Sequence, residues 1–471
     1  MYRPVGNLER FSTACHHLGY YRCVTSTARH ATGYAPSNLS RVLELALSKV
    51  ILQHPLLCVG IVNEDKHDAA FVRLNSIDLS KCLEYKVISA STKAEYDKSL
   101  EGILEHQHSQ SWSDLDIRPG WKLIVVEGSF EASSNRFVFD AIFAFHHALG
   151  DGSSGIVFHQ SMLEALNRSK MPDSDGFTKH IVQIPDSIAL PPPTEEQINF
   201  QVSWAFLAKE VWHVLLSKWS TFLGRGPWAG FPPSAQSIQA YRSRVKVFSI
   251  SPEQLSIILH NCREQRSTLT GLLYGIITVA LALRIPTARS FNTLTPYSLR
   301  HLLDPSRKED MGMYVSSYEI TYPLEHISSI IKSRHSSVQL RQHIWTIARS
   351  FRESIVVELS RLPRDNHIGL LTYVKNYHGI FRSQIGRPRE LTFAVSNLGS
   401  CKCEGDEHGW RIEEMIFSQS GFGIGAAFSF NVVSVANGPL TISTTWLEGA
   451  VQEEVICEVS KYLEKEMASM R

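Results

Sequence analysis

Hydrophobic and polar positions near the start of the chain follow helical and strand-like spacings in turn. From about Asn38 to Gln53 the apolar residues recur with helical periodicity, which predicts a helix that Ser37 caps and Pro55 follows. Similar patterns predict further helices at 7–18 and 92–108, and strands at 20–28, 56–62, 69–74 and 83–88. The beginning of the chain therefore mixes helices and strands.

Two strongly apolar strands are predicted next, at 122–127 and 137–145. The second is almost entirely hydrophobic, which is typical of a strand buried on both faces in the middle of a sheet. It runs directly into His146 and His147, and a Gly-Asp-Gly turn precedes a helix predicted at about 155–166, with Ser153 or Ser154 as its cap. The pattern thus places two histidines at the end of a central strand.

A stretch rich in Pro, Ser, Asp and Thr at 167–197 precedes a second alternation of elements. There we expect helices at 253–265, 269–284, 340–360 and 451–467, and strands at 391–397, 411–417, 427–435 and 440–446. A length of 471 residues exceeds one ordinary core. We predict an α/β chain with an N-terminal lobe at 1–180, a crossover linker with an aromatic helix at 181–230, and a C-terminal lobe at 231–471.

The aromatic segment runs from Phe200 to Leu223 and interleaves Trp, Phe, Leu and Val with Lys, Glu and His. We interpret it as a helix packed in the core or between the lobes. The alternative is a helix that docks on a membrane interface or roofs a hydrophobic tunnel.

Composition narrows the expected partners. Hydrophobic residues make up 43% and charged residues 20%, and 47 Lys and Arg balance 46 Asp and Glu. This balance argues against nucleic acid and anionic membranes and favours small molecules. The N-terminus has no apolar signal region, and the longest apolar run, Leu272–Leu283, falls short of the roughly 20 residues that span a bilayer. We expect a monomeric cytoplasmic protein whose contact with a membrane or lipid droplet is at most peripheral.

Eight cysteines are scattered along the chain without the spacing of a disulfide framework, so reduced thiols are expected. Cys401-Lys402-Cys403 raises the question of a metal site. One Cys-x-Cys without a partner pair favours an ordinary loop instead, and we predict no metal site.

His147 is the candidate general base. A histidine that follows a buried strand on a glycine-bounded turn has a fixed backbone and a ring free to face a cleft. With an ordinary pKa of about 6.5, its neutral imidazole can take a proton from an alcohol and return it to a leaving group. The other adjacent pair, His16-His17, lacks a following Asp-Gly and is interpreted as packing or surface.

Asp151 lies between Gly150 and Gly152 on the same turn. Its carboxylate could orient the imidazole or hold the loop, and the flanking glycines favour the structural role. An interior carboxylate requires a cation, for which Arg300 is the candidate because it follows a strand-like run at 291–299.

The segment Phe145-His146-His147-Ala148-Leu149-Gly150-Asp151-Gly152 resembles the His-His-x-x-x-Asp-Gly signature of the chloramphenicol acetyltransferase-like superfamily, which includes condensation domains and BAHD acyltransferases. The runs at 6–12 and 17–21 resemble the start of fungal alcohol acetyltransferases, and Ser396-Asn397-Leu398-Gly399 is similar to a Ser/Thr-Asn-x-Gly stretch of the superfamily. The plant signature Asp-Phe-Gly-Trp-Gly is absent, which disfavours the BAHD branch proper.

This resemblance implies a fold of two lobes, each a mixed sheet flanked by helices, with the active site in a channel between them. It also implies that His147 is the base, that Asp151 holds the loop through an arginine matching Arg300, and that Ser396 and Asn397 lie near the cleft. The implied reaction transfers an acetyl group directly from acetyl-CoA, a co-substrate rather than a bound cofactor. Asn397 or a nearby hydroxyl is the candidate oxyanion donor. Abundant Phe, Trp and Leu suggest an apolar acceptor alcohol, such as a secondary metabolite.

Other reaction classes lack their motifs. Gly-x-Ser-x-Gly and the phosphate-binding loop are missing, and the glycines at 421–425 have no dinucleotide-type helix after them. Two alternatives remain. One is a condensation-type enzyme that takes its acyl group from a carrier protein, and the other is a non-catalytic binding protein on the same scaffold.

Overall fold

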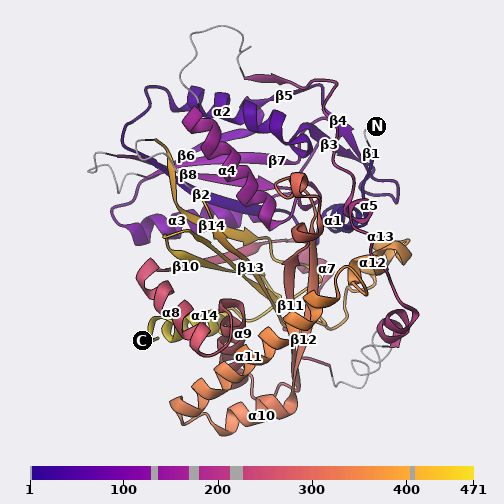
Figure 1. Cartoon of the computed structure of the whole chain (residues 1–471), viewed down its shortest axis with the longest axis vertical. Helices are drawn as coiled ribbons and strands as arrows, with labels where there is room; N and C mark the ends of the chain where they lie inside the picture. The colour runs from indigo at the N-terminus through magenta and orange to yellow at the C-terminus, as the bar shows by residue number, and fades with distance from the viewer. Residues whose placement is uncertain (1–2, 129–135, 169–179, 213–225, 404–408, 471) are drawn as a thin grey trace.

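The computed structural model describes residues 3–128, 136–168, 180–212, 226–403 and 409–470. Two large sheets dominate these parts of the chain (Figure 1). One has five strands in the order β14-β2-β8-β7-β6, and the other has six in the order β10-β16-β15-β13-β11-β12. The chain therefore forms a mixed α/β fold with two sheet-based lobes.

The five-stranded sheet forms most of the N-terminal lobe. Its strands are β2 (Val24–Thr32), β6 (Leu83–Ile88), β7 (Trp121–Gly128), β8 (Phe137–Phe145) and β14 (Arg411–Gln419). Its helices are α2 (Leu39–Gln53), α3 (Lys93–Ser109) and α4 (Gly152–Arg168). β8 is central and almost wholly buried, which confirms the sequence-based prediction for 137–145.

Successive side chains of β8 point to α4 and to α3 in turn, which places these two helices on opposite faces of the sheet. Phe143 of β8 stacks on Phe158 of α4 at a ring-centroid distance of 3.8 Å. The neighbouring Ile142 instead belongs to the apolar cluster that Leu100 and Leu104 of α3 complete. Because successive side chains of a strand point to opposite faces, β8 is covered on both sides and its end is held rigidly.

The six-stranded sheet forms the C-terminal lobe. Its strands are β10 (Ser243–Ile250), β11 (Ser290–Ser298), β12 (Val315–Pro323), β13 (Phe393–Cys401), β15 (Phe428–Val435) and β16 (Leu440–Leu447). The helices packed with it are α8 (Pro252–Glu264), α9 (Leu269–Arg284), α10 (Leu324–Lys332), α11 (Ser337–Arg361) and α14 (Glu453–Ala468).

Helix α9 is the core helix of this lobe and is buried from Gly271 to Ala282. It contains the whole of the longest apolar run of the sequence, Leu272–Leu283, whose hydrophobicity therefore serves packing. In the part of the chain that is described, no single helix is long and apolar enough to cross a membrane; α8 and α9 reach that length only as a pair bent by 91°.

Smaller elements surround the sheets. Two small sheets pair β1 (Arg3–Pro4) and β3 (Val59–Val62) with β4 (Ala70–Arg73), and β5 (Ser76–Asp78) with β9 (Ile181–Gln183). The remaining helices are α1 (Asn7–His17), α5 (Thr194–Gln197), α7 (Ala235–Gln239), α12 (His367–Leu370) and α13 (Tyr377–Arg382). Short 3-10 helices lie at Pro55–Cys58, Leu79–Lys81, His147–Leu149, Arg300–Leu302, Pro305–Arg307 and Leu371–Tyr373.

Strand β14 joins a different lobe from the one expected. The sequence assigned 411–417 to the C-terminal lobe, but β14 pairs antiparallel with β2 along the edge of the N-terminal sheet. Its carbonyls at Met415 and Phe417 also accept hydrogen bonds from Thr441 and Ser443 of β16. The strand thus connects the lobes, because periodicity predicts that a strand exists but not which edge it joins.

Several local predictions also need correction. Asn38, rather than Ser37, caps α2, because its side chain accepts a hydrogen bond from the Arg41 backbone N–H. Residues 55–58 form a 3-10 turn rather than the start of a strand. At α4 the capping acceptor is Asp151, to which the Ser154 backbone N–H donates at 2.9 Å.

The aromatic segment is described only as far as residue 212, where a helix covers 204–212. The packing interpretation is wrong for Trp204 and Trp212, which are 86% and 63% exposed. Phe206 contacts the ring of His367 on α12, so that side of the helix docks on the lobe. Residues 213–223 of the predicted helix lie outside the described residues.

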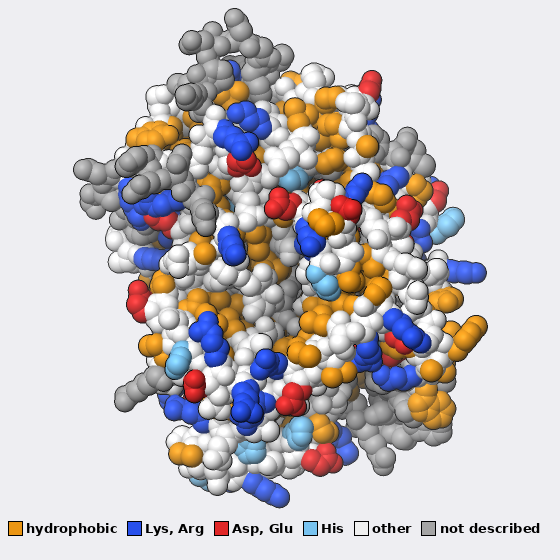
Figure 2. All heavy atoms as spheres, viewed as in Figure 1, with side chains coloured by type: hydrophobic (Ala, Val, Ile, Leu, Met, Phe, Trp, Pro, Cys, Tyr) orange, Lys and Arg blue, Asp and Glu red, His pale blue; other side chains and the backbone are white. Residues whose placement is uncertain are grey.

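Charged side chains are dispersed on the face of the molecule that Figure 2 shows. On the face shown in Figure 2, Lys and Arg side chains are interspersed with Asp, Glu and apolar groups. This distribution agrees with the net charge of +1.

Candidate active site

His147 lies where the central strand β8 leaves its sheet, on the 3-10 turn His147–Leu149. The backbone N–H of His146 donates to the Gly120 carbonyl at 2.7 Å, which anchors the turn to the start of β7. The turn lies between β8, which precedes it in the chain, and α4, which follows it, so both of its ends are held by regular structure.

The tautomer of His147 follows from its hydrogen bond. Nδ1 lies 2.9 Å from the carbonyl oxygen of Gly150, and a carbonyl oxygen can only accept. Nδ1 therefore carries the hydrogen and Nε2 carries the lone pair. Burial lowers the pKa of His147, and this effect outweighs the Gly150 hydrogen bond and the nearby Asp151 carboxylate, which act to raise it. The ring is neutral at neutral pH and presents an acceptor at Nε2.

A cavity of about 170 Å³ opens beside His147, between the two lobes. Most of its lining is apolar, and it draws on α1, β11, β13, β15 and the glycine-rich stretch after β14. The lining side chains that define its character are Phe11, Leu294, Pro296, Leu391, Ala394 and Phe422. Polar groups at its wall include Tyr21, Ser396, Gln419 and Ser429. An apolar site with few polar groups is typical of small-molecule binding.

Tyr21 covers the ring of His147, with centroids 5.3 Å apart. Its hydroxyl donates to Gln419 Oε1 at 2.9 Å, and Gln419 Nε2 donates in turn to Asn431 Oδ1 at 2.7 Å. Asn431 Nδ2 donates to Ser443 Oγ at 3.1 Å. This buried chain of hydrogen bonds ties the N-terminal lobe to β15 and β16 and fixes the tyrosine against the imidazole.

Asp151 and Arg300 form an ion pair across the lobes. Arg300 Nη2 lies 3.0 Å from Asp151 Oδ1, and both side chains are largely buried. The second carboxylate oxygen accepts from the Tyr314 backbone N–H at 3.1 Å, and Oδ1 also accepts from Ser154. Arg300 Nη1 donates to the Lys308 carbonyl as well. Both carboxylate oxygens are therefore engaged by Arg300, Ser154 and Tyr314.

Gly152 follows Asp151 at the first position of α4. A side chain there would have its Cβ 2.7 Å from Leu398 Cδ2 and 2.8 Å from Phe417 Cζ. Those two side chains come from β13 and β14, so glycine lets the turn approach the C-terminal part of the chain closely.

Ser396 and Asn397 differ in their relation to the cavity. Ser396 lines it, whereas Asn397 does not belong to the described lining. Asn397 Nδ2 donates to Thr270 Oγ1 at 3.0 Å, and its Oδ1 accepts from the Gly399 backbone N–H at 2.9 Å. Its Oδ1 and one of its two N–H groups are therefore engaged away from the lining, so Ser396 is the better oxyanion candidate of the two.

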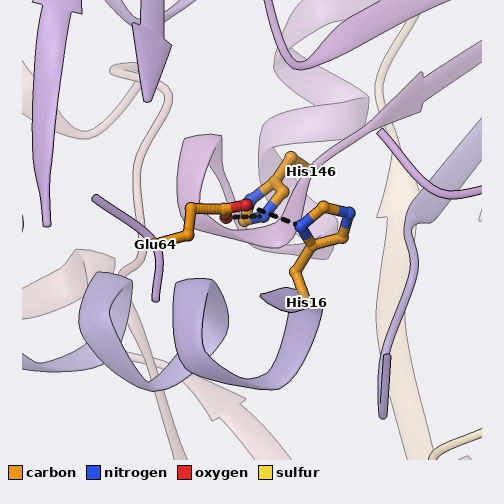
Figure 3. Close-up of side chains that lie close together, drawn as sticks. All are labelled: His16, Glu64 and His146. Atoms are coloured by element: carbon orange, nitrogen blue, oxygen red, sulfur yellow. Dashed lines mark hydrogen bonds and ion pairs between the residues drawn. The ribbon is translucent and has the colours of Figure 1, made fainter. Parts of the chain in front are cut away.

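His146 belongs to a separate buried cluster with His16 and Glu64 (Figure 3). His16 Nδ1 lies 2.9 Å from Glu64 Oε2, and His146 Nε2 lies 3.0 Å from Glu64 Oε1. The second contact lacks the alignment of a full hydrogen bond. Two imidazoles and a carboxylate are also the ligand types of a zinc site, so the cluster must be tested for that chemistry.

Tautomers argue against a metal in this cluster. The Ala148 backbone N–H donates to His146 Nδ1 at 3.0 Å, and the Trp112 backbone N–H donates to His16 Nε2 at 3.2 Å. In a neutral imidazole one nitrogen accepts and the other carries hydrogen. Both nitrogens that face Glu64 therefore carry hydrogens and have no lone pair for a metal. The cluster is better suited to hold a carboxylate between two N–H donors.

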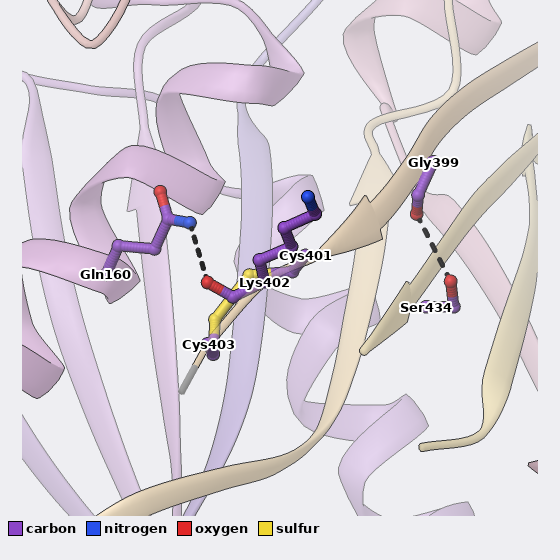
Figure 4. The surroundings of a disulfide bond; sticks show 6 residues. All are labelled: Gln160, Gly399, Cys401, Lys402, Cys403 and Ser434. Carbon is purple, nitrogen blue, oxygen red and sulfur yellow. Dashed lines mark hydrogen bonds between the residues drawn. A yellow bond between two sulfur atoms is a disulfide. The ribbon is translucent and has the colours of Figure 1, made fainter. Parts of the chain in front are cut away.

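Cys401 and Cys403 form a disulfide at the end of β13 (Figure 4). The expectation of reduced thiols is wrong for this pair, because the strand end brings the two side chains together. Beside it, Gln160 Nε2 of α4 donates to the Lys402 carbonyl at 3.2 Å. The other six cysteines are free. The bonded pair offers no thiolate to a metal.

Sequence reasoning missed Tyr21, Gln419 and Glu64. Tyr21 stands in the run at 17–21 that resembles the family's start, so that resemblance was an available signal. His16 was interpreted as packing or surface, and the structure shows it buried beside His146 with a specific partner. Nothing in the local pattern marks Glu64 or Gln419, whose partners lie far away in the sequence.

Comparison with known sequences identifies relatives along the whole chain. The sequence model of the alcohol acetyltransferase family matches residues 4–467. The probable alcohol acetyltransferase FCK4 of Fusarium pseudograminearum is 28% identical over 479 residues, covering 98% of this chain and 94% of that protein. The probable alcohol acetyltransferase crmB of Aspergillus fumigatus is 26% identical over 487 residues, covering 98% of this chain and 99% of that protein.

Solved structures share the fold at low sequence identity. The TRI3 trichothecene 15-O-acetyltransferase from Fusarium sporotrichioides has a TM-score of 0.75 at 14% identity, over 100% of this chain and 94% of that one. The first condensation domain of the CDA synthetase has a TM-score of 0.57 at 12% identity, over 100% and 97% of the two chains. These likenesses confirm the predicted fold class.

Proposed function

Because the chain belongs to the alcohol acetyltransferase family and is therefore an acyltransferase, we propose that it moves an acetyl group from acetyl-CoA to the hydroxyl of an apolar alcohol with His147 as general base. Family membership removes the non-catalytic binding protein as an alternative. The donor, the base and the class of alcohol are the parts of the proposal that rest on the site.

The observation that carries the proposal is the neutral, Nδ1-protonated imidazole of His147 beside the inter-lobe cavity. Its Nε2 lone pair can accept the proton of an alcohol as the hydroxyl oxygen attacks the thioester carbonyl. The resulting tetrahedral oxyanion collapses with cleavage of the carbon–sulfur bond. The imidazolium then returns the proton to the thiolate of CoA, so no acyl-enzyme forms.

The imidazolium that forms during the reaction needs stabilisation. The Gly150 carbonyl accepts from Nδ1–H throughout and fixes the ring's orientation, while the carboxylate of Asp151 supplies nearby negative charge. Ser396 is the proposed donor to the oxyanion, because its side chain lines the cavity together with His147. One well-placed donor of this kind contributes about 3 kcal/mol to transition-state stabilisation.

The apolar lining supports an apolar acceptor. Phe11 and Phe422 contact each other at the wall, with ring centroids 6.3 Å apart, and aliphatic groups from β11 and β13 complete it. A secondary metabolite with a free hydroxyl fits this chemistry better than a sugar, whose hydroxyls would lose hydrogen bonds to water.

The proposal is tested by incubating the protein with acetyl-CoA and a panel of apolar and polar alcohols. Release of free CoA thiol is measured together with the mass of the ester product. We expect product from apolar alcohols and none from sugars. Transfer only from an acylated carrier protein, with free acetyl-CoA inert, would establish the condensation-type alternative instead.

A further inference from the structure

Glu64 makes contacts to three separate segments of the chain. It follows β3, just after Asn63, whose backbone has a φ of 58°. Its carboxylate lies between His16 of α1 and His146 of the catalytic turn (Figure 3). Its backbone carbonyl accepts from His378 Nε2 of α13 at 2.9 Å. One residue therefore meets α1, α13 and the residue next to His147.

The carboxylate of Glu64 stays ionised in this place. Burial acts to raise its pKa, but the interactions with the His146 and His16 imidazoles outweigh burial and hold the pKa well below its usual range. Burial also lowers the pKa of His146, which agrees with a neutral ring whose Nε2–H faces the carboxylate. A negative charge is thus maintained behind the catalytic turn.

Helix α1 links this cluster to the cavity. The same helix that carries His16 in its last turn places Phe11, Ser12 and Cys15 in the cavity lining. A shift of α1 away from the turn would widen the space between this wall and His147. The position of the wall relative to the base therefore depends on the contact between His16, Glu64 and His146.

We infer that Glu64 is a positioning residue for acyl transfer: its carboxylate holds the turn that carries His147 against α1 and keeps base and cavity wall at a fixed separation. The inference rests on the proposed role of His147. Glu64 itself touches neither substrate nor reacting atoms in this account.

Glu64→Gln breaks the arrangement at nearly constant volume. A carboxylate accepts two N–H groups at once, whereas an amide offers one acceptor oxygen and turns an NH2 group toward the second N–H. The amide NH2 group then faces the N–H of one of the two histidines, and two donors repel each other. Since small displacements of reacting groups reduce catalysis strongly, we expect kcat to fall roughly 10- to 100-fold.

The pH profile and the split between kcat and KM separate positioning from a general loss of structure. Glu64 acts on the pKa of His146, whereas burial, the Gly150 hydrogen bond and Asp151 set the pKa of His147, so Glu64→Gln should lower kcat while KM and the acid limb of kcat/KM stay close to those of the wild type. The other titratable or charged groups around His147 are His146, Asp151, Arg300, Tyr21 and Cys15. All of them are unchanged in the variant.

Glu44→Gln is the matched control. Glu44 of α2 is also buried and also pairs with a histidine, at 2.6 Å from His180 Nδ1, but it does not line the cavity. We expect its kcat and acid limb to match the wild type even if Tm falls. Wild-type kcat in a folded Glu64→Gln protein would overturn the inference.

His16→Phe decides the matter if Glu64→Gln does not fold. The phenyl ring keeps an aromatic group on α1 but removes the N–H that faces Glu64 and the acceptor for the Trp112 N–H, so kcat should fall while the acid limb stays in place. Unchanged kcat in this variant would contradict the inference. Full turnover by His147→Ala would instead remove the proposed function, so the two failures are distinguishable.

Discussion

The two ring nitrogens of His147 have separate tasks. Nδ1–H is committed to the Gly150 carbonyl at 2.9 Å, and this bond selects the tautomer whose Nε2 can accept a proton. Tyr21 limits rotation of the ring from the other side. The orientation of a single imidazole thus depends on a backbone carbonyl of its own turn and on a tyrosine from a distant segment.

The pH dependence of kcat/KM follows from the same residue. Burial lowers the pKa of His147, and the base works only when neutral. Activity should therefore persist as pH falls through about 6.5, the ordinary histidine value, and decline only below it. Initial rates at saturating acetyl-CoA between pH 4.5 and 8, roughly the range in which histidines titrate, would show this. An acid limb above the ordinary value would contradict the assignment.

Helix–helix contact in the C-terminal lobe depends on two glycines. A Cβ at Gly275 of α9 would lie 2.3 Å from the Ile344 carbonyl oxygen, and one at Gly271 would lie 2.6 Å from the Ala348 carbonyl oxygen. Both carbonyls belong to α11. These glycines permit the close approach that buries α9 from Gly271 to Ala282.

Gly275→Ala should destabilise the protein because α11 must move to admit the methyl group. The expected loss is about 1–3 kcal/mol of unfolding free energy, the usual cost of overpacking. Gly102→Ala on α3 is the matched control, since nothing lies within 4 Å of a Cβ there. Alanine should stabilise that exposed helical position by roughly 0.5–1 kcal/mol. Chemical denaturation of both variants measures the difference, and equal effects would refute the packing argument.

Elements with a strong hydrophobic pattern could be predicted from the sequence. The strands that pair at the edges of the two sheets could not. The helix at 269–284 and the strand at 137–145 have the predicted bounds, because both segments are strongly apolar over most of their length. β10 was missed although Val245 and Val247 alternate with Arg244 and Lys246. β14 was assigned to the wrong lobe because its partner β2 lies almost 400 positions away.

The two lobes are joined at the molecular scale by groups that also fix the site. Glu101 and Glu105 of α3 accept from the Val247 and Val245 backbone N–H groups on the edge of β10. Asp151 and Arg300 connect the catalytic turn to the segment after β11. These contacts keep the two lobes, and with them the walls of the cavity, in a fixed relative position. Substitutions at the lobe boundary should therefore lower stability and activity together.

Asp151→Asn should reduce both stability and activity. It leaves the buried guanidinium of Arg300 without its counter-charge, a loss of about 3–5 kcal/mol. In the double variant Asp151→Asn with Arg300→Gln the losses should be less than additive, since neither charge remains unpaired. Unfolding free energies of the four proteins give the coupling. Strict additivity would show that the pair does not act as a unit.

The candidate site was only partly predictable at this scale. His147, Asp151 and Arg300 could be named because a local motif and the resemblance it carries point to them. Glu64 meets His146 and Gln419 meets Tyr21 only through the tertiary fold, across sequence separations that no local pattern encodes. The sequence named Asn397 or a nearby hydroxyl as the oxyanion donor, and only the structure favours Ser396, which lines the cavity while Asn397 bonds to Thr270.

The most direct test of this account is the turnover of His147→Ala with acetyl-CoA and an accepted alcohol. His106→Ala, an exposed histidine on α3, serves as the matched control. We predict that His147→Ala lowers kcat roughly 10²- to 10⁴-fold with an unchanged Tm, while His106→Ala keeps wild-type kcat. A folded His147→Ala protein that turns over at the wild-type rate would contradict the account.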